Sequence, residues 1–350
     1  MMATPTSRKN SDESNSSSNA GEDLDAPHRV HVPPKHGQKT KGVACTGVFM
    51  LAFTTLMLIV VVGIDIALET NILVTKAVLN PAILSVSEEE FSCSPMTVNL
   101  SNIEYHSRHR YYSIMKELDP PSPPLFRDNH TVLCNESLRS DLGYGYCLPI
   151  SGRKDAPFCT GADRMDLLTQ HSRRTRCYAS VLHMLLVEIY EELQAYARSP
   201  ALVFGSLLGA VRNGSMIPFT EDTDIAYSGE LSEDNDVGRA LMQKGYHFFH
   251  LNIWRVCVAP THPLAAKLYE PTLPITEAYR VPYLDLYAME QLNDTAWSVE
   301  GYREDIIPAD KVKPFSQVII NGLPFDTVHD PNYFLVEMYG DDFMVPKPRG

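Results

Sequence analysis

The sequence predicts an α/β or α+β domain around a mixed sheet in the second half of a 350-residue chain. Apolar residues recur at helical spacing between Tyr178 and Leu193. Short apolar segments typical of strands follow, and turn residues separate them from further helical segments. Because helices that alternate with strands pack on the faces of a sheet, this order of elements predicts the fold class.

The first predicted element is a helix that ends near Ala197, because its apolar side chains fall at i, i+3 and i+4. Later elements follow from apolar runs and from glycines that end helices. They are, in chain order, a buried strand at 202–204, a short helix at 207–211 directly after Gly205-Ser206, a strand at 224–227, a helix at about 233–244 that stops at Gly245, and a strand of alternating character at 281–287. We therefore place the main domain at residues 166–350.

Two segments of different character open the chain. Residues 1–42 are rich in Ser, Asn, Pro and charge, which predicts a disordered tail. Residues 43–64 carry no charge, and a helix of that length would measure about 33 Å, enough to cross a hydrocarbon core of about 30 Å. We expect a transmembrane helix at 43–65 rather than a buried soluble helix. A cleaved signal peptide is disfavoured because the apolar run is long and starts far from the N-terminus.

The charges beside this segment predict its orientation. Basic residues precede it, namely Arg29, Lys35, Lys39 and Lys41, and the acids Asp65 and Glu69 follow it. Because positive charge stays on the cytosolic side, the tail should face the cytosol and the rest of the chain a lumen or the exterior. We expect a single-pass type II protein of the Golgi or endoplasmic reticulum membrane.

Cysteines and sequons agree with this orientation. Six cysteines lie beyond the predicted span, at positions 93, 134, 147, 159, 177 and 257. They can form three disulfides in an oxidising compartment, with the pairing left open. We therefore expect residues 66–165 to be a disulfide-stapled, loop-rich stem or accessory region. Five glycosylation sequons also lie on this side, at Asn99, Asn129, Asn135, Asn213 and Asn293. Use of Asn213 is not expected, because a glycan there could block the motif described next.

Asp222 and Asp224 are the strongest candidates for chemistry. Residues i and i+2 of a strand point to the same face, and two neighbouring carboxylates in a partly buried site favour a raised pKa or a bound cation. Mg²⁺ and Mn²⁺ prefer such oxygen ligands and keep positions open for phosphates. Two other Asp-x-Asp pairs, at 23/25 and 234/236, lie in the tail and at a helix start, and we interpret them as solvated charge.

Three further features complete a candidate metal–phosphate site. Gly205-Ser206 offers backbone N–H groups at a helix start, which suits an anion, and Arg212 adds a positive charge. Asp285 lies between apolar strand residues, so it is either a third functional carboxylate or the partner of a base. The net charge of −13 argues against nucleic acid as a partner, because phosphate backbones require basic surfaces.

The motif also resembles a known family. Gly205-Ser206-Leu207-Leu208-Gly209-Ala210-Val211-Arg212, with Ile217-Pro218-Phe219 and Asp222-Thr223-Asp224-Ile225, is similar to the signature of the LicD family, which includes bacterial phosphorylcholine transferases, fukutin and fukutin-related protein. Later matches are Asp305-Ile306-Ile307-Pro308, Asn321-Gly322-Leu323-Pro324-Phe325 and Tyr339-Gly340-Asp341 before Pro346. The resemblance covers about residues 176–350.

The resemblance implies a nucleotidyltransferase-like fold and phosphotransfer from a cytidine diphosphate (CDP) donor. It implies that Gly205 and Ser206 contact donor phosphate and that Asp222, Asp224 and Asp285 hold a metal. The sequence departs from the family pattern in four places: Phe219 replaces Trp, Thr220 and Glu221 stand where acids, usually Asp, are common, and Thr223 replaces an aliphatic residue. The motif aspartates remain, so metal binding is still expected.

The leading hypothesis is a Mg²⁺- or Mn²⁺-dependent phosphotransferase. It would move an alcohol phosphate, similar to ribitol phosphate or phosphocholine, from a CDP-linked donor to a hydroxyl of a glycan or glycoprotein, with Arg212 among the donor-binding residues. Two alternatives remain open. One is a metal-dependent glycosyltransferase that uses a nucleotide sugar at the same Asp-x-Asp pair. The other is a catalytically silent relative that binds glycans or organises partner enzymes.

Overall fold

A computed structural model describes residues 56, 57, 60, 91–118, 122–169, 175–276, 278–304 and 306–347. Most of the predicted membrane helix at 43–65, the whole predicted tail at 1–42, residues 66–90 and the motif residue Asp305 lie outside them. None of the helices within the described ranges has the length and apolar character needed to cross a membrane. The chain divides into residues 1–85 and a compact unit of residues 86–350, which contains every element named below.

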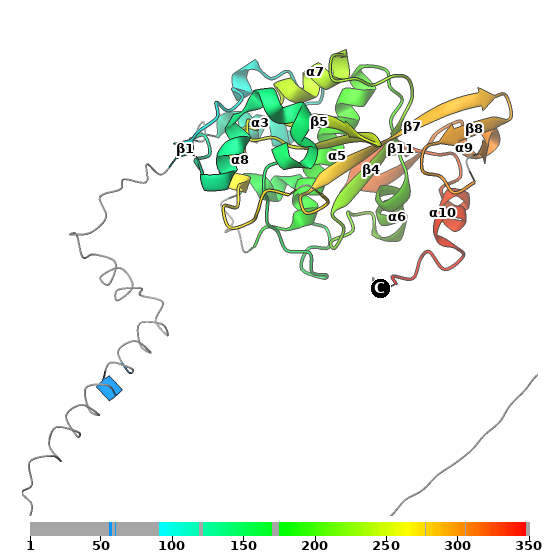
Figure 1. Ribbon diagram of the computed structural model, residues 1–350. Coiled ribbons are helices and arrows are strands. Elements are labelled where there is room, and N and C mark those ends of the chain that lie inside the picture. Colours follow the sequence, from blue (N-terminus) through cyan, green and yellow to red (C-terminus); the bar gives the residue numbers. More distant parts are fainter. Residues whose placement is uncertain are drawn as a thin grey trace, which may run out of the picture. The chain divides into compact units, whose positions relative to one another are not determined.

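A mixed sheet forms the centre of this compact unit, as the sequence predicts. Nine strands of the described residues belong to it: in spatial order β10 (Ser316–Ile320), β11 (Leu323–Thr327), β3 (Ala201–Leu202), β4 (Asp222–Tyr227), β7 (Tyr283–Asn293), β6 (Ile253–Val258) and β5 (Tyr246–Leu251), with β8 (Ala296–Val299) beside β7 and β9 (Ile307–Pro308) beside β8. The central strands β4 and β7 run parallel, whereas β7 pairs antiparallel with β6 (Figure 1). This mixture of directions results from the different connections between neighbouring strands.

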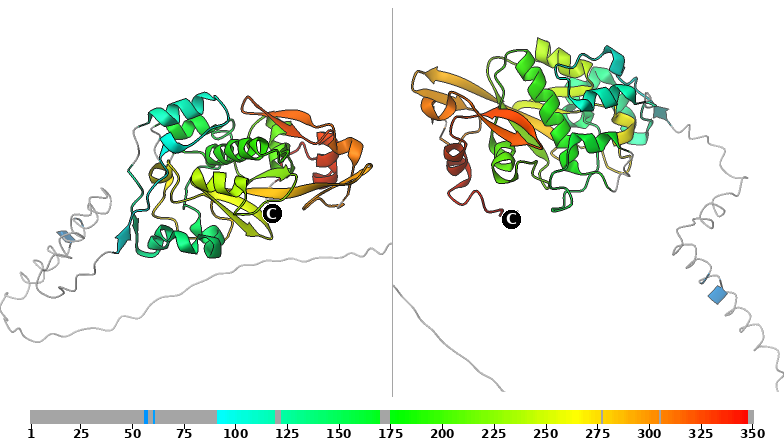
Figure 2. Two further views of the ribbon diagram at one scale, coloured as in Figure 1. Left: turned by 90° about the horizontal axis from the view of Figure 1, so that it is seen from above. Right: turned by 180° about the vertical axis from the view of Figure 1, so that it is seen from behind.

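Helices cover the sheet and its ends. They are α3 (Arg110–Glu117), α4 (Arg139–Leu142), α5 (Tyr178–Ala195), α6 (Phe204–Asn213), α7 (Asp236–Gln243), α8 (Ala265–Leu268), α9 (Ala309–Val312) and α10 (Pro331–Tyr339). The helix α5 packs against β4, β6 and β7, and α6 packs against β4 and against α10. Both views of Figure 2 place the cyan segments near residue 100 at one end of the unit and the orange to red elements β10, β11 and α10 at the other.

The helix α5 is buried on more sides than its amphipathic pattern predicts. Its buried residues include Glu188 and Glu192 as well as its apolar side chains. The cause is the accessory region, because residues such as Tyr111 and Leu133 pack into the same hydrophobic core as α5. The buried carboxylates pair with cations: Glu188 lies 3.5 Å from Arg164, and Glu192 contacts Lys244.

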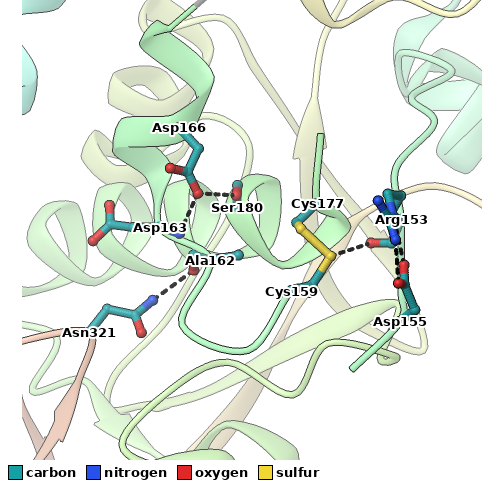
Figure 3. The surroundings of a disulfide bond; sticks show 9 residues. All are labelled: Arg153, Asp155, Cys159, Ala162, Asp163, Asp166, Cys177, Ser180 and Asn321. Carbon is teal, nitrogen blue, oxygen red and sulfur yellow. Dashed lines mark hydrogen bonds and ion pairs between the residues drawn. A yellow bond between two sulfur atoms is a disulfide. The ribbon is translucent and has the colours of Figure 1, made fainter. Parts of the chain in front are cut away.

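The described part of the accessory region is rich in loops, and disulfides cross-link it. It contains several short 3₁₀ helices and a two-stranded sheet of β1 (Ser92–Cys93) and β2 (Phe126–Arg127). The six cysteines form three disulfides: Cys93–Cys134, Cys147–Cys257 and Cys159–Cys177. The second joins the region to β6, and the third joins it to the start of α5 (Figure 3). Figure 3 also shows the Asn321 amide donating to the Ala162 carbonyl, at 2.8 Å.

Several element boundaries differ from the sequence-based expectations. The predicted strand at 202–204 ends at Leu202, and Phe204 already begins α6 with a positive φ of 44°. Gly205-Ser206 therefore lies in the first turn of that helix. The strand β4 begins two residues earlier than predicted, at Asp222. The strand β7 continues to Asn293, because its second half pairs with β8 in a hairpin.

Candidate functional site

The parallel pair β4–β7 brings the three predicted carboxylates together. Asp224 and Asp285 are register partners, and Asp222 lies two residues before Asp224 on the same face of β4. One ligand oxygen of each residue can be chosen so that all three lie within 4.8 Å of one another. Asp224 and Asp285 are each only 5% exposed, whereas Asp222 is half-buried. The sequence-predicted set is therefore assembled in space.

The first turn of α6 holds the Asp224 carboxylate. The Ser206 N–H donates to Asp224 Oδ2 at 3.2 Å, and the Ser206 hydroxyl accepts from the Asp224 N–H at 2.7 Å. The same hydroxyl lies 2.6 Å from Thr223 Oγ1. A Cβ atom on Gly205 would lie 3.0 Å from Asp224 Oδ2, so a side chain there would crowd the carboxylate. Gly205 and Ser206 thus position an acid, and their predicted contact with donor phosphate stays a prediction.

Asp285 pairs with a basic residue, which is one of the two interpretations that the sequence allows. Arg255 on β6 is its register partner, and the guanidinium Nε lies 2.9 Å from Asp285 Oδ1. The Tyr287 hydroxyl lies 3.3 Å from Asp285 Oδ2 and 3.4 Å from Asp224 Oδ1. Asp285 therefore both pairs with a base and stands beside the two motif aspartates.

Asp222 is held from two sides. The Thr220 hydroxyl donates to Asp222 Oδ1 at 2.5 Å, and the Tyr283 hydroxyl lies 3.4 Å from Asp222 Oδ2. Thr220 is one of the departures from the family pattern, and here it orients a predicted metal ligand. The tyrosines at 283 and 287 were missed by sequence reasoning, although their i±2 spacing from Asp285 on a strand places them on its face.

Burial makes the negative charges of this cluster costly. Burial first, and then the charges of Asp222 and Asp285, raise the pKa of Asp224 well above its usual value. Burial also raises the pKa of Asp285 to about 6, although the Arg255 charge opposes that shift. When ionised, the three carboxylates carry more negative charge than the one guanidinium offsets, and a divalent cation would balance the excess. An all-carboxylate oxygen set fits Mg²⁺ or Mn²⁺.

A pocket of about 550 Å³ opens beside the carboxylates. Its lining comes from α6, the segment after Ile217, Tyr287, Gly301 and the chain from Met338 to Lys347. Arg212 and Lys347 are the cationic side chains among the lining residues. Arg212 donates to the main-chain carbonyl of Phe343, so it lies at the pocket as predicted but already has partners there.

The sequon at Asn213 lies at the opposite end of α6 from Gly205 and is exposed. Asn213 is not among the residues that line the pocket. The neighbouring motif residue Arg212 does line the pocket, and the expectation that the sequon at Asn213 is not used stays a prediction.

The comparison with protein families agrees with the motif. Residues 200–327 match the family model described as LicD/FKTN/FKRP, nucleotidyltransferase domain. No curated protein matches the chain. The matched range contains the whole carboxylate cluster and the first turn of α6, and it ends before α10. Residues 200–327 of this chain are therefore similar to the nucleotidyltransferase domain of the LicD family.

Proposed function

We propose that this protein is a metal-dependent phosphotransferase that modifies glycans, moving an alcohol phosphate from a CDP-linked donor to a glycan hydroxyl. The main observation behind this proposal is that Asp222, Asp224 and Asp285 lie close together beside a pocket. Two cationic side chains also line that pocket. The similarity to the LicD family supports the phosphotransferase class and the link to glycans. The choice of a cytidine donor rests on the resemblance of the motif.

The pocket suits a nucleotide donor. Its volume of about 550 Å³ falls within the range of small-molecule sites. The aromatic side chains Phe219 and Tyr339 line it and offer faces for a base, and Phe219 is 41% exposed. Arg212 and Lys347 add positive charge to the same pocket lining that contains Asp222 and Asp224. This combination favours a diphosphate that contacts the cationic side chains and a metal ion held by the acids.

The three aspartates would hold Mg²⁺ or Mn²⁺ in this proposal. The bound ion would neutralise charge on the diphosphate and on the departing cytidine monophosphate (CMP). Tyr287 and Arg255 keep Asp285 in place, and the first turn of α6 keeps Asp224 in place. Such positioning supplies most of the catalysis in phosphoryl transfer.

The proposed reaction has one bond formed and one broken at phosphorus. The acceptor hydroxyl oxygen bonds to the phosphorus that carries the alcohol. The bond from that phosphorus to the bridging oxygen breaks, and CMP leaves with the electron pair. The hydroxyl proton passes to a carboxylate of the cluster or to a water that the carboxylate orients.

We also propose that the enzyme works in the lumen of the Golgi or endoplasmic reticulum as a single-pass type II membrane protein. The three disulfides support this proposal, because such bonds persist in oxidising compartments. The uncharged stretch at 43–64 and the basic residues before it support the membrane anchor.

The test is CMP release by the full-length chain with Mn²⁺ and a panel of CDP-alcohols. We expect release from the wild type and from the control Asp234→Asn/Asp236→Asn, whose acids are exposed at the start of α7. Asp222→Asn/Asp224→Asn should release no CMP, and normal turnover by this variant would contradict the site. Release of UDP or GDP from nucleotide sugars would favour a glycosyltransferase. Absence of any Mn²⁺-dependent cytidine nucleotide binding would favour the silent relative.

A further inference from the structure

We name residues 340–347 the pocket segment. The Arg212 side chain makes hydrogen bonds to main-chain carbonyls of this segment. Its Nε donates to the Phe343 carbonyl at 2.6 Å, its Nη2 donates to the same carbonyl, and Nη2 also lies 3.3 Å from the Val345 carbonyl. A guanidinium presents its donors in a rigid planar fork, so these bonds fix the direction of the segment as well as its distance from α6.

The pocket segment has few other attachments. Gly340 leaves α10 with a φ of 88°, and from residue 341 to 347 only Phe343 is buried. Met344 and Val345 are 50% and 60% exposed. Because a segment with so little buried apolar surface opens at low cost, its position depends on Phe343 and on the hydrogen bonds from Arg212.

The pocket segment carries the second cation of the pocket. Lys347 lines the pocket, and its Nζ lies 2.7 Å from the Asp342 carboxylate. Both side chains of that ion pair are 59% exposed, and exposed pairs contribute little to stability. Lys347 can therefore exchange Asp342 for a phosphate, whereas the Nε and Nη2 donors of Arg212 are committed to carbonyls.

We propose that Lys347 is the cation that binds the donor's diphosphate and that Arg212 is a positioning residue that acts through the pocket segment. The identity of the ligand rests on the proposed function. The matched family range ends at residue 327, so it assigns no role to the pocket segment. The proposal differs from the direct phosphate contact that the motif predicts for Arg212.

Hydrogen exchange of the ligand-free, full-length protein tests whether Arg212 holds the pocket segment in place. Arg212→Ala and Arg212→Lys should both speed exchange of the Phe343 and Val345 amides, which bond to Gly340 and Asp342 carbonyls within the segment. Lysine keeps the charge but lacks the fork. The matched control is Arg239→Ala, because Arg239 also donates to a backbone carbonyl, that of Asp234 on a distant surface. Unchanged exchange of the pocket segment in both Arg212 variants would contradict the positioning role of Arg212.

Calorimetry with CDP and Mn²⁺ tests the route from Arg212 to Lys347. Lys347→Ala and Arg212→Ala should each weaken binding about tenfold, the usual worth of a charged hydrogen bond. If Arg212 acts through Lys347, the double variant should bind no more than about twofold worse than Arg212→Ala, because coupled residues are not additive. Arg212→Lys should bind as weakly as Arg212→Ala. Additive losses, or full binding by Arg212→Lys, would overturn the proposal.

The same design separates this proposal from the proposed donor. If wild-type protein binds no CDP with Mn²⁺, the cytidine donor is wrong, and inorganic pyrophosphate with Mn²⁺ becomes the probe. Pyrophosphate binding that Lys347→Ala does not weaken, or no pyrophosphate binding at all, overturns the role of Lys347. The exchange measurement uses no ligand, so it decides the role of Arg212 in either case.

Discussion

Asp224 on β4 and Asp285 on β7 face each other as register partners across the only parallel contact that β4 makes in the described sheet. Both carboxyls are buried, and the negative charge of Asp285 is one cause of the raised pKa of Asp224. The ladder of backbone hydrogen bonds holds the two strands together, so the carboxylates cannot move apart to reduce their repulsion. The fold therefore favours a proton or a cation between them.

Asp224→Asn should stabilise the metal-free protein at neutral pH. The pKa of Asp224 and that of Asp285 are raised by burial, so the folded protein holds these protons more tightly than the unfolded chain does. Their contribution to stability is therefore greatest at low pH and is lost as the pH rises through the folded pKa, about 6 for Asp285. Asparagine carries no charge, so the variant does not lose this stability as the pH rises. Its side-chain oxygen can still accept the hydrogen bond from the Ser206 N–H.

Urea unfolding in EDTA measures that effect. At pH 7 the free energy of unfolding of Asp224→Asn should exceed the wild-type value, because the variant does not bury a negative charge at this position. At about pH 4 the difference should disappear, because the wild-type carboxyls are then protonated. A variant that is less stable than the wild type at pH 7 would show that the cluster is not electrostatically strained.

Mn²⁺ binding should strengthen as the pH rises from 5 to 7. The cation binds the carboxylates, so it must displace the proton that Asp285 holds with a pKa of about 6. Below that pKa the apparent affinity should rise about tenfold per pH unit for each proton released. Calorimetry in buffers of different ionisation enthalpy measures both the affinity and the proton release. An affinity that stays constant between pH 5 and 7 would place the cation elsewhere.

Much of the carboxylate cluster could be predicted from the sequence, because strand periodicity is a local property. The i, i+2 spacing places Asp222 and Asp224 on one face, and an acid between apolar residues singles out Asp285. Arg255 could not be predicted, since its pairing with Asp285 depends on the register of β6 against β7. Such long-range register leaves no signal in the spacing of residues along one chain.

Backbone strain and distant packing explain the other differences. Phe204 is apolar and follows an apolar run, a pattern that predicts a strand, yet Phe204 has a positive φ and begins α6. The pattern of α5 predicts one apolar face, but residues far earlier in the chain bury its other faces. The carbonyl partner of Arg212 could not be predicted for a similar reason, because it lies more than a hundred residues away in the chain.

Arg255→Ala should strongly destabilise the protein. The side chains of Arg255 and Asp285 are 8% and 7% exposed, so removal of the guanidinium leaves a buried carboxylate without its ion pair. Loss of one partner of a buried pair costs about 3–5 kcal/mol. Urea unfolding at pH 7 measures this loss, and at pH 5 it should be smaller because Asp285 is then protonated more easily.

The control is Arg239→Ala, which breaks an exposed pair with Asp236 and should cost less than about 1 kcal/mol. Equal losses in the two variants would contradict a buried electrostatic role for Arg255.

Gly205→Ala should weaken Mn²⁺ binding without unfolding the protein. The new Cβ would lie 3.0 Å from Asp224 Oδ2, closer than ordinary van der Waals contact, and the Ser206 N–H restrains that carboxylate from retreating. We expect the Mn²⁺ affinity to fall about tenfold, which corresponds to about 1.4 kcal/mol. Gly145→Ala is the control, because its Cβ would meet its nearest neighbour at 3.5 Å and lies outside the pocket. If Gly205 instead serves close approach of the donor phosphate, Gly205→Ala will bind Mn²⁺ alone as the wild type does and lose affinity only for CDP.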